Sequence, residues 1–234
     1  MWHKKNKFPA LARLKNFKFD AQKLTEDLKE IASNKQFDGL MAEYSGLCKT
    51  HNKLPDFFLK QGEIPNETAS YSQLALSAWD ESYSLETRQE TSGTLWDYTH
   101  PKKNKIADER FYRKKAFELP EYLDSVLQEF RPYLHRCRFA KLKAQSEVLP
   151  HVDYDTTYGI RLHIAIETNN ECTNGAFLKN GDTVSEHIPA DGSVWFVNQG
   201  LKHWAKNMGT TDRTHLILSI DSQKFIEDLQ LSEV

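Results

Sequence analysis

The stretch "LPHVDYDTTYGIRLHIAI", residues 149 to 166, places side chains that bind metals just ahead of an apolar strand pattern. His151 and Asp153 are two residues apart, so in extended backbone both side chains leave the same face and can converge on one point. A third ligand has to come from elsewhere, and His203 in "NQGLKHWAKN", directly after the strand pattern "SVWFV", is the best candidate. Two imidazoles and one carboxylate form the facial arrangement that leaves three coordination positions free on Fe(II). The spacing alone is a weak signal, because a solvated loop histidine beside an aspartate has the same pattern.

Basic side chains in two later strand patterns could bind an anion near these ligands. Arg161 and His163 alternate with aliphatic residues, so they face one side of their strand. An inward guanidinium requires a carboxylate, which either the protein or a ligand can supply. Arg213, ten residues after His203, repeats this placement ahead of "HLILSI". Each arginine alone is better explained by an internal salt bridge, but together with the three candidate ligands they favour a bound carboxylate.

Short strand patterns dominate the chain after residue 132. They read "RCRFAKLK", "IRLHIAIE", "GAFLK", "DTVSEHI", "SVWFV" and "HLILSI". Hairpin signals separate them, namely Asn-Gly at 174–175 and 180–181 and Asp-Gly at 191–192. The pair at 180–181 predicts a two-residue turn with positive φ at both positions. Consecutive antiparallel strands with helices at one end predict a mainly β sandwich or jelly roll with helices packed outside.

Two helical patterns precede these strands. "FDAQKLTEDLKEIASN" has apolar residues near a 3.6-residue period and Asp20 placed to cap its start. "LPEYLDSVLQEFRPYL" has the same period, with Pro120 in the first turn. Between them, residues 86–110 are polar and interrupted by glycine and proline, which predicts a long loop that is either a lid or disordered.

Length and composition predict one soluble domain. The 234 residues suffice for a stable core, with a helical and mixed part at 1–132 and a β core at 133–222. The net charge of -2 provides no global field for nucleic acid or an anionic membrane. Three cysteines without CxxC spacing favour a reducing compartment. No apolar run reaches the roughly 20 residues that span a bilayer, so we expect a cytoplasmic protein without a membrane partner.

Four stretches carry a family resemblance: "RCRFAKLKAQSEVLPHVDYD", "IRLHIAIETN", "GSVWFVNQGLKHWAKNMG" and "DRTHLILSID". They resemble the aspartyl/asparaginyl β-hydroxylase-like group of iron(II)- and 2-oxoglutarate-dependent oxygenases, which includes bacterial hydroxylases of free proline. The family pattern is met in order from Arg136 to Asp221, over a little more than a third of the chain. The front half contains no motif of the family.

The resemblance implies a double-stranded β-helix, which is a cupin-like jelly roll. It also implies Fe(II) as the cofactor and 2-oxoglutarate and O2 as co-substrates. It implies that His151, Asp153 and His203 are the iron ligands. It also implies that Arg213 pairs with the distal carboxylate of 2-oxoglutarate. Arg161 and His163 would then lie near the metal-bound end of that molecule.

The substrate expectation depends on Asp153. Enzymes of this family that act on epidermal-growth-factor-like domains are understood to lack the carboxylate ligand, so its presence here favours a free amino acid or another small molecule. Such a substrate needs a cation for its carboxylate and an anion or carbonyl for its ammonium. Arg138, Asp155 and Tyr158 are the nearest candidates in sequence. Arg138 can equally be structural, and Asp155 can simply cap a turn.

Other functions remain open from the sequence. Hydroxylation of a residue in a peptide or protein is the nearest alternative. The nucleic-acid-repair branch of these oxygenases typically has a second arginine six residues after the one that corresponds to Arg213, and this chain has Ser219 there. The sequence also lacks the excess of basic residues that phosphate binding requires. Both observations argue against nucleic-acid repair. A non-catalytic binding module on a cupin-like scaffold and a zinc hydrolase are more distant, since neither explains two inward arginines.

Overall fold

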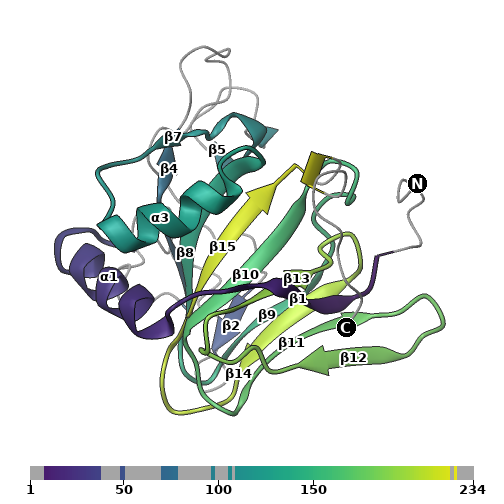
Figure 1. Cartoon of the computed structure of the whole chain (residues 1–234). Helices are drawn as coiled ribbons and strands as arrows, with labels where there is room; N and C mark the ends of the chain where they lie inside the picture. Colours follow the sequence, from purple (N-terminus) through teal and green to yellow (C-terminus); the bar gives the residue numbers. More distant parts are fainter. Residues whose placement is uncertain are drawn as a thin grey trace.

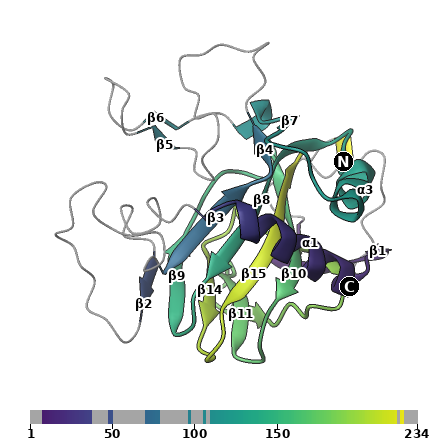
Figure 2. The ribbon, with the colours of Figure 1, turned by 90° about the vertical axis from the view of Figure 1, so that its left-hand side faces the viewer.

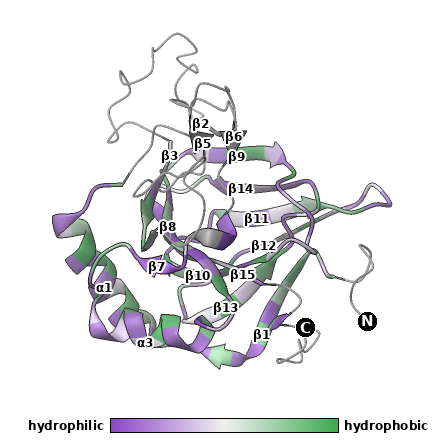
Figure 3. Ribbon diagram, turned by 90° about the horizontal axis from the view of Figure 1, so that it is seen from above, coloured by the Kyte–Doolittle hydropathy of each residue, from purple (hydrophilic) through white to green (hydrophobic). Residues whose placement is uncertain are grey.

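Two antiparallel sheets face each other in this protein, as seen from above in Figure 3. The computed structural model describes residues 8–37, 48–50, 70–78, 96–97, 105–106, 109–221 and 224–225. Sheet A has the strand order β1-β13-β10-β15-β8-β3, and sheet B has the order β12-β11-β14-β9-β2. In these orders, sheet A consists of Leu11–Lys18, Ser193–Val197, Ile160–Glu167, Arg213–Ile220, Leu134–Leu142 and Tyr71–Ala75. Sheet B consists of Thr183–Glu186, Cys172–Phe177, His203–Asn207, Ser146–His151 and Cys48–Thr50.

The path from β8 to β15 is that of a double-stranded β-helix. Strand β8 lies in sheet A, β9 in sheet B, β10 in sheet A, β11 and β12 in sheet B, β13 in sheet A, β14 in sheet B and β15 in sheet A. Such alternation encloses a space between the two sheets. The predicted mainly β jelly roll is therefore confirmed.

Helices α1 (Ala21–Asn34) and α3 (Glu121–Phe130) cover the outer face of sheet A (Figures 1 and 2). The Asp20 carboxylate accepts hydrogen bonds from the backbone N–H groups of Gln22 and Lys23, so it caps α1 as predicted. Pro120 occupies the N-cap position of α3 instead of the first turn. No helix of the described residues is long and apolar enough to cross a membrane.

Strand register divides sheet A into two chemically different faces. Residues paired across antiparallel strands share a face, and Arg138 pairs with Ile217, which pairs with His163. The face toward sheet B, here called the cavity face, contains Arg136, Arg138, Arg161, His163, Arg213 and His215. The opposite face, here called the core face, packs against the helices through Cys137, Phe139, Leu162, Ile164, Leu216 and Leu218.

The turn predicted at 174–175 was wrong, and the hairpin predicted at 180–181 is present with a different turn. Asn174 and Gly175 lie inside β11, because Gly175 gives the Trp204 ring room to pack directly over the backbone. The β11–β12 hairpin has the five-residue loop 178–182, where Gly181 N–H donates to the Leu178 carbonyl. Within this loop only Gly181 has positive φ, so a wider loop replaces the two-residue turn.

The front part of the chain contributes more strand than the sequence predicts. It supplies the edge strands β1 and β3 to sheet A and β2 to sheet B. It also supplies two short strand pairs, which are β4 (Ser77–Ala78) with β7 (Lys114–Lys115) and β5 (Trp96–Asp97) with β6 (Lys105–Ile106). The rest of the loop predicted at 86–110 lies outside the described residues until the short 3-10 helix η2 (Glu109–Phe111).

Candidate active site

The three candidate metal ligands meet where β9 ends and the neighbouring interior strand β14 of sheet B begins. His203 on β14 pairs directly with His151 on β9, and their ring centroids are 4.3 Å apart. Asp153 follows β9 by two residues, with Oδ1 3.5 Å from His151 Nε2 and Oδ2 3.9 Å from His203 Nε2. One ligand atom from each residue lies within 4.8 Å of the others. This cluster can hold a metal ion.

Backbone carbonyls fix the orientation of both imidazoles. His151 Nδ1 lies 2.7 Å from the carbonyl oxygen of Leu149, and His203 Nδ1 lies 2.9 Å from that of Leu201. A carbonyl only accepts hydrogen bonds, so both Nδ1 atoms carry the proton and both Nε2 lone pairs are free on the side facing Asp153. The donor set therefore fits a divalent cation, with the outer ring nitrogens anchored as is usual in metal sites.

The charges of the cluster also suit metal binding. Burial lowers the pKa of His203 to about 4, so this imidazole is neutral at pH 7. Burial acts to raise the pKa of Asp153, but Arg161 and the two imidazoles outweigh it and hold that pKa below its ordinary value. The Arg161 guanidinium donates directly to Asp153 Oδ2. An ionised carboxylate and a neutral imidazole are the forms that a metal requires.

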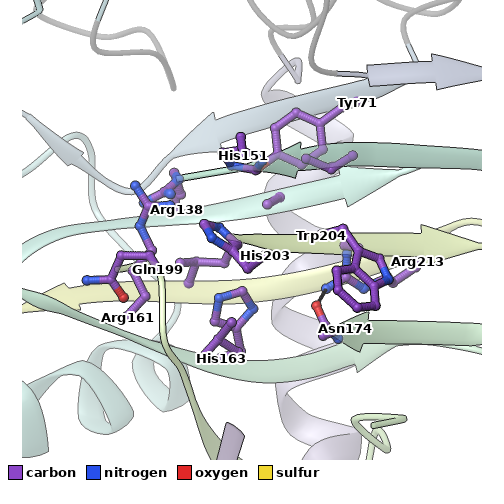
Figure 4. Close-up of a pocket in the computed structure, with 15 residues that line it drawn as sticks. Tyr71, Arg138, His151, Arg161, His163, Asn174, Gln199, His203, Trp204 and Arg213 are labelled. Atoms are coloured by element: carbon purple, nitrogen blue, oxygen red, sulfur yellow. Dashed lines mark hydrogen bonds between the residues drawn. The ribbon is translucent and has the colours of Figure 1, made fainter. Parts of the chain in front are cut away.

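A cavity between the sheets extends on both sides of this cluster (Figure 4). Its volume is about 560 Å³, counted with the solvent-filled space at its mouth. Figure 4 shows Arg138, Arg161 and Gln199 at one end, with His203 and His163 in the middle. The remaining end is formed by Arg213, Asn174 and Trp204. The cavity therefore has a guanidinium at each end.

Arg213 is a buried cation that has no carboxylate partner among the described residues. Its side chain is 3% exposed, and its Nη2 donates to Asn174 Oδ1 at 2.8 Å while its Nε donates to His215 Nε2 at 3.0 Å. Burial lowers the pKa of Arg213 to about 10, so the group stays charged at neutral pH. No acidic side chain of the described residues forms an ion pair with it. A buried charge held only by neutral groups is a site for an anionic ligand.

Two neutral histidines connect Arg213 to the middle of the cavity. His163 Nδ1 lies 3.3 Å from His215 Nδ1. Burial lowers the pKa of both imidazoles well below the ordinary value, and the charge of Arg213 lowers both further. Both histidines are neutral at pH 7, so among the described lining residues the charge at this end of the cavity comes from Arg213.

The sequence profile of the aspartyl/asparaginyl beta-hydroxylase family matches residues 59–223, well over half of the chain. The chain belongs to this family. Among curated relatives, the L-proline cis-4-hydroxylase of Rhizobium meliloti (strain 1021) is 30% identical over 93 residues, covering 38% of this chain. The match spans only 31% of that relative's own length.

Solved structures of related folds overlap this family member only in part. An oxidoreductase of the 2OG-Fe(II) oxygenase family from Burkholderia pseudomallei covers 37% of the chain at 15% identity and a TM-score of 0.32, matching 43% of its own length. A prolyl-4-hydroxylase from Pseudomonas putida covers 43% at 14% identity and a TM-score of 0.36, matching 64% of its own length.

Most of the predicted site residues of this β-hydroxylase family member surround the cavity between the two sheets. It is lined by Arg138, His151, Arg161, His163, His203 and Arg213, with Asp153 bonded to Arg161. Asp155 and Tyr158 are not part of its lining. The Asp155 carboxylate accepts from the backbone N–H of Thr157 at 2.9 Å and so stabilises a turn. The Tyr158 ring lies against Tyr154 and under the Arg110 guanidinium.

Among the lining residues with polar or aromatic side chains, four were not predicted as site residues from the sequence, namely Tyr71, Asn174, Gln199 and Trp204. Asn174 had been interpreted as a turn residue, although its place on β11 brings its amide to Arg213. His215, which bonds Arg213 from behind, could have been found, because residues two apart in a strand share a face. Tyr71 gives no signal, since the partner of its edge strand is far away in the chain.

Asn207 has a structural role at the end of β14. The side-chain amide of Asn207 donates to the carbonyl oxygens of Leu142 and Thr211 at 3.1 and 2.9 Å. Its oxygen accepts from the backbone N–H of Gly209 at 3.2 Å. These bonds hold the connection from β14 to β15, and so they fix where Arg213 enters the cavity.

Proposed function

We propose that this chain is an Fe(II)- and 2-oxoglutarate-dependent dioxygenase that hydroxylates a C–H bond of a free amino acid or a similar small molecule. One observation carries the proposal: a two-imidazole, one-carboxylate cluster shares a cavity with a buried arginine that has no carboxylate partner in the part of the chain that the structure describes. The cluster suits Fe(II) with open coordination positions. Arg213 suits the far carboxylate of a short dicarboxylate.

The bound iron and 2-oxoglutarate would supply the oxidising chemistry, in which O2 inserts one oxygen atom into a C–H bond and the other into succinate, with release of carbon dioxide. His151, Asp153 and His203 would hold the metal. Arg161 would keep Asp153 ionised and oriented through its direct hydrogen bond. Arg213 and His163 would position the co-substrate, whose distal carboxylate replaces the missing ion-pair partner.

Apolar residues complete the site. Val148, Val197 and Ile217 line the same cavity as the metal cluster. They limit the water that reaches the reacting atoms, and a drier site strengthens each electrostatic interaction within it. The protein would thus contribute position, charge and dryness, while the metal and co-substrate contribute the oxidation.

Two observations support a small substrate. Asp153 is present as a carboxylate ligand candidate, and a curated relative is named an L-proline cis-4-hydroxylase. Hydroxylation of an Asp, Asn or other residue within a peptide is the alternative for the same site. The two functions differ in whether the substrate presents a free amino-acid head.

Succinate formation tests the proposed function. The protein is loaded with Fe(II) and 2-oxoglutarate without oxygen, exposed to O2, and assayed with a panel of free amino acids and short peptides beside a His203→Ala control. We expect at least one free amino acid to raise succinate formation above the uncoupled background, and the control to be silent because one metal ligand is lost. Stimulation by peptides alone would favour the peptide-hydroxylase alternative. Absence of both 2-oxoglutarate binding and turnover would contradict the dioxygenase and favour a binding module.

A further inference from the structure

A stack of two tyrosine rings and two guanidinium groups ends at the carboxylate of the candidate metal cluster. The Arg161 guanidinium lies over the Tyr154 ring, 5.2 Å from its centroid, and the Tyr154 and Tyr158 ring centroids are 4.5 Å apart. The Arg110 guanidinium lies over the Tyr158 ring at 4.7 Å. We propose that Tyr154 is a positioning residue, whose ring holds the Arg161 guanidinium in the orientation in which it bonds Asp153. This inference rests on the proposed function and adds to that site a residue outside the cavity lining.

Hydrogen bonds alone do not define the orientation of the Arg161 guanidinium. Among the described residues it donates one hydrogen bond, from Nη1 to Asp153 Oδ2, and its buried Nε has no hydrogen-bond partner. A planar group held by one hydrogen bond is free to turn about that bond. Guanidinium groups stack on aromatic faces, and a cation is attracted to the face of a ring. The Tyr154 ring therefore supplies the second contact that fixes the guanidinium plane.

The orientation of Arg161 decides which oxygen of Asp153 a metal can use. Oδ2 accepts the hydrogen bond from Arg161, and Oδ1 lies 3.5 Å from His151 Nε2. Oδ1 is therefore the carboxylate oxygen that stays available for a metal. If the guanidinium turned away, the carboxylate would be free to rotate, and either oxygen could face the imidazoles. Groups that bond to metal ligands orient those ligands, and their loss commonly lowers metal affinity.

The loop that carries Tyr154 is fixed at both ends by Gln199. The backbone N–H of Asp153 donates to the Gln199 carbonyl oxygen at 3.2 Å. The side-chain Nε2 of Gln199 donates to the carbonyl oxygen of Gly159 at 2.6 Å. Gln199 is fully buried, so it is a fixed point for this loop. The Tyr154 ring thus has a defined place relative to strand β10, which carries Arg161.

The ring face of Tyr154, and not its hydroxyl, makes the contact with Arg161. The Tyr154 hydroxyl oxygen is buried and has no hydrogen-bond partner among the described residues. Phenylalanine at this position would keep the ring face and remove a buried polar group that lacks a partner. Leucine would remove the ring face and keep an apolar side chain. The inference therefore predicts different results for Tyr154→Phe and Tyr154→Leu.

Binding of Co(II) to the metal-free protein tests the inference without turnover. Calorimetry gives the Kd, and the visible absorption bands of bound Co(II) report the number and geometry of its ligands. We expect Tyr154→Leu to weaken Co(II) binding by about 3- to 10-fold and to change the bands, because Asp153 is no longer held in one orientation. Tyr154→Phe should retain the wild-type Kd and bands. 2-Oxoglutarate is then titrated into each Co(II)-loaded protein.

Two comparisons assign the effect to the contact with Arg161. Tyr122→Leu is the matched control, because the Lys23 ammonium lies over the Tyr122 ring at 5.2 Å on helix α3, outside the cavity lining. It should lower the melting temperature without altering Co(II) binding. Tyr154→Leu is also introduced into Arg161→Met, where the ring has no guanidinium to hold. In this double-mutant cycle the second substitution should change the Kd by less than about twofold.

The outcomes are distinct. If the wild type binds Co(II) and 2-oxoglutarate, and Tyr154→Leu leaves the Kd and the bands unchanged, Tyr154 is not a positioning residue and the proposed dioxygenase stands. The inference is also wrong if Tyr154→Leu has an equal effect in the Arg161→Met background, or if Tyr154→Phe is as impaired as Tyr154→Leu. If the wild type binds no Co(II), the proposed function fails and the inference fails with it.

Discussion

The two faces of sheet A are built from the same strands and have opposite chemistry. On β15, Leu216 and Leu218 point to the helices, while Arg213 and His215 point to the cavity. On β8, Phe139 belongs to the core, and Arg138 lines the cavity. Because side chains alternate along a strand, neighbouring residues belong to different environments. A single strand thus contributes to folding on one face and to chemistry on the other.

This difference shows how the molecule can hold several buried cations. Buried apolar surface stabilises a fold by roughly 25 cal/mol per Å², whereas a buried charge without a partner destabilises it. The core face joins α1, α3 and sheet A in one apolar cluster. The cavity face is the face on which ligands would restore the missing partners. We therefore expect stability and ligand affinity to respond to different substitutions.

The largest expected effect is on the core face. Leu218 is fully buried, so Leu218→Ala should lower the free energy of unfolding by about 3 kcal/mol through lost burial and an added cavity. Urea denaturation of the metal-free protein measures this value. The folded fraction should retain the 2-oxoglutarate affinity of the wild type. A large loss of affinity at unchanged stability would contradict the division between the faces.

Substitution of a residue on the cavity face should weaken ligand binding strongly and lower the free energy of unfolding only a little. Arg213→Met should weaken 2-oxoglutarate binding by about 2–3 kcal/mol, or roughly 30- to 150-fold in Kd, because a buried charge-assisted pair is lost. Its free energy of unfolding should fall by less than that of Leu218→Ala, since the variant also removes a buried unpaired charge. Calorimetric titration with 2-oxoglutarate in the presence of Mn(II) and urea denaturation of the same sample provide both values. If Arg213→Met and Leu218→Ala lowered the free energy of unfolding equally, the two faces of sheet A would not have separate roles.

The smallest change expected from one substitution concerns the pH dependence of stability. Burial lowers the pKa of His163 and His215 in the folded protein, so between pH 6.5 and 5 the unfolded state binds protons that the folded state does not. The free energy of unfolding should therefore decrease as the pH falls through this range, by up to about 1.4 kcal/mol per pH unit for each such histidine. His215→Asn should reduce the slope measured by urea denaturation of the metal-free protein. If the free energy of unfolding depends on pH equally in the variant and the wild type, His215 is not the source of this pH dependence.

The sequence predicted what depends on local pattern. The caps and periodicity of "FDAQKLTEDLKEIASN" predicted α1, and the short alternating segments predicted the strands from β8 onward. The His-x-Asp spacing predicted that His151 and Asp153 share a face, and the structure brings His203 to them. Residues two apart in a strand lie on the same side whatever the tertiary fold.

Long-range pairing explains what the sequence did not predict. Strands β1 and β3 pair with β13 and β8, which lie far along the chain, and no local pattern indicates this pairing. The interior position of Gly175 depends on the Trp204 ring of the neighbouring strand, so its local pattern indicated a turn. Gln199 lies in a connection whose sequence predicts no site, and only the fold brings it beside Arg161.

The anchoring of the two imidazoles has an evolutionary consequence. Each Nδ1 contacts the main-chain carbonyl of the residue two positions earlier, Leu149 or Leu201. Main-chain oxygens persist through any substitution, so point mutations cannot delete these anchors as they can delete a side-chain carboxylate in the same role. Drift in the surrounding side chains can thus reshape which molecule is accepted without disturbing ligand orientation. Such a scaffold is well suited to diversification into new substrate preferences, and directed evolution from this chain could begin at the Arg138 end of the cavity.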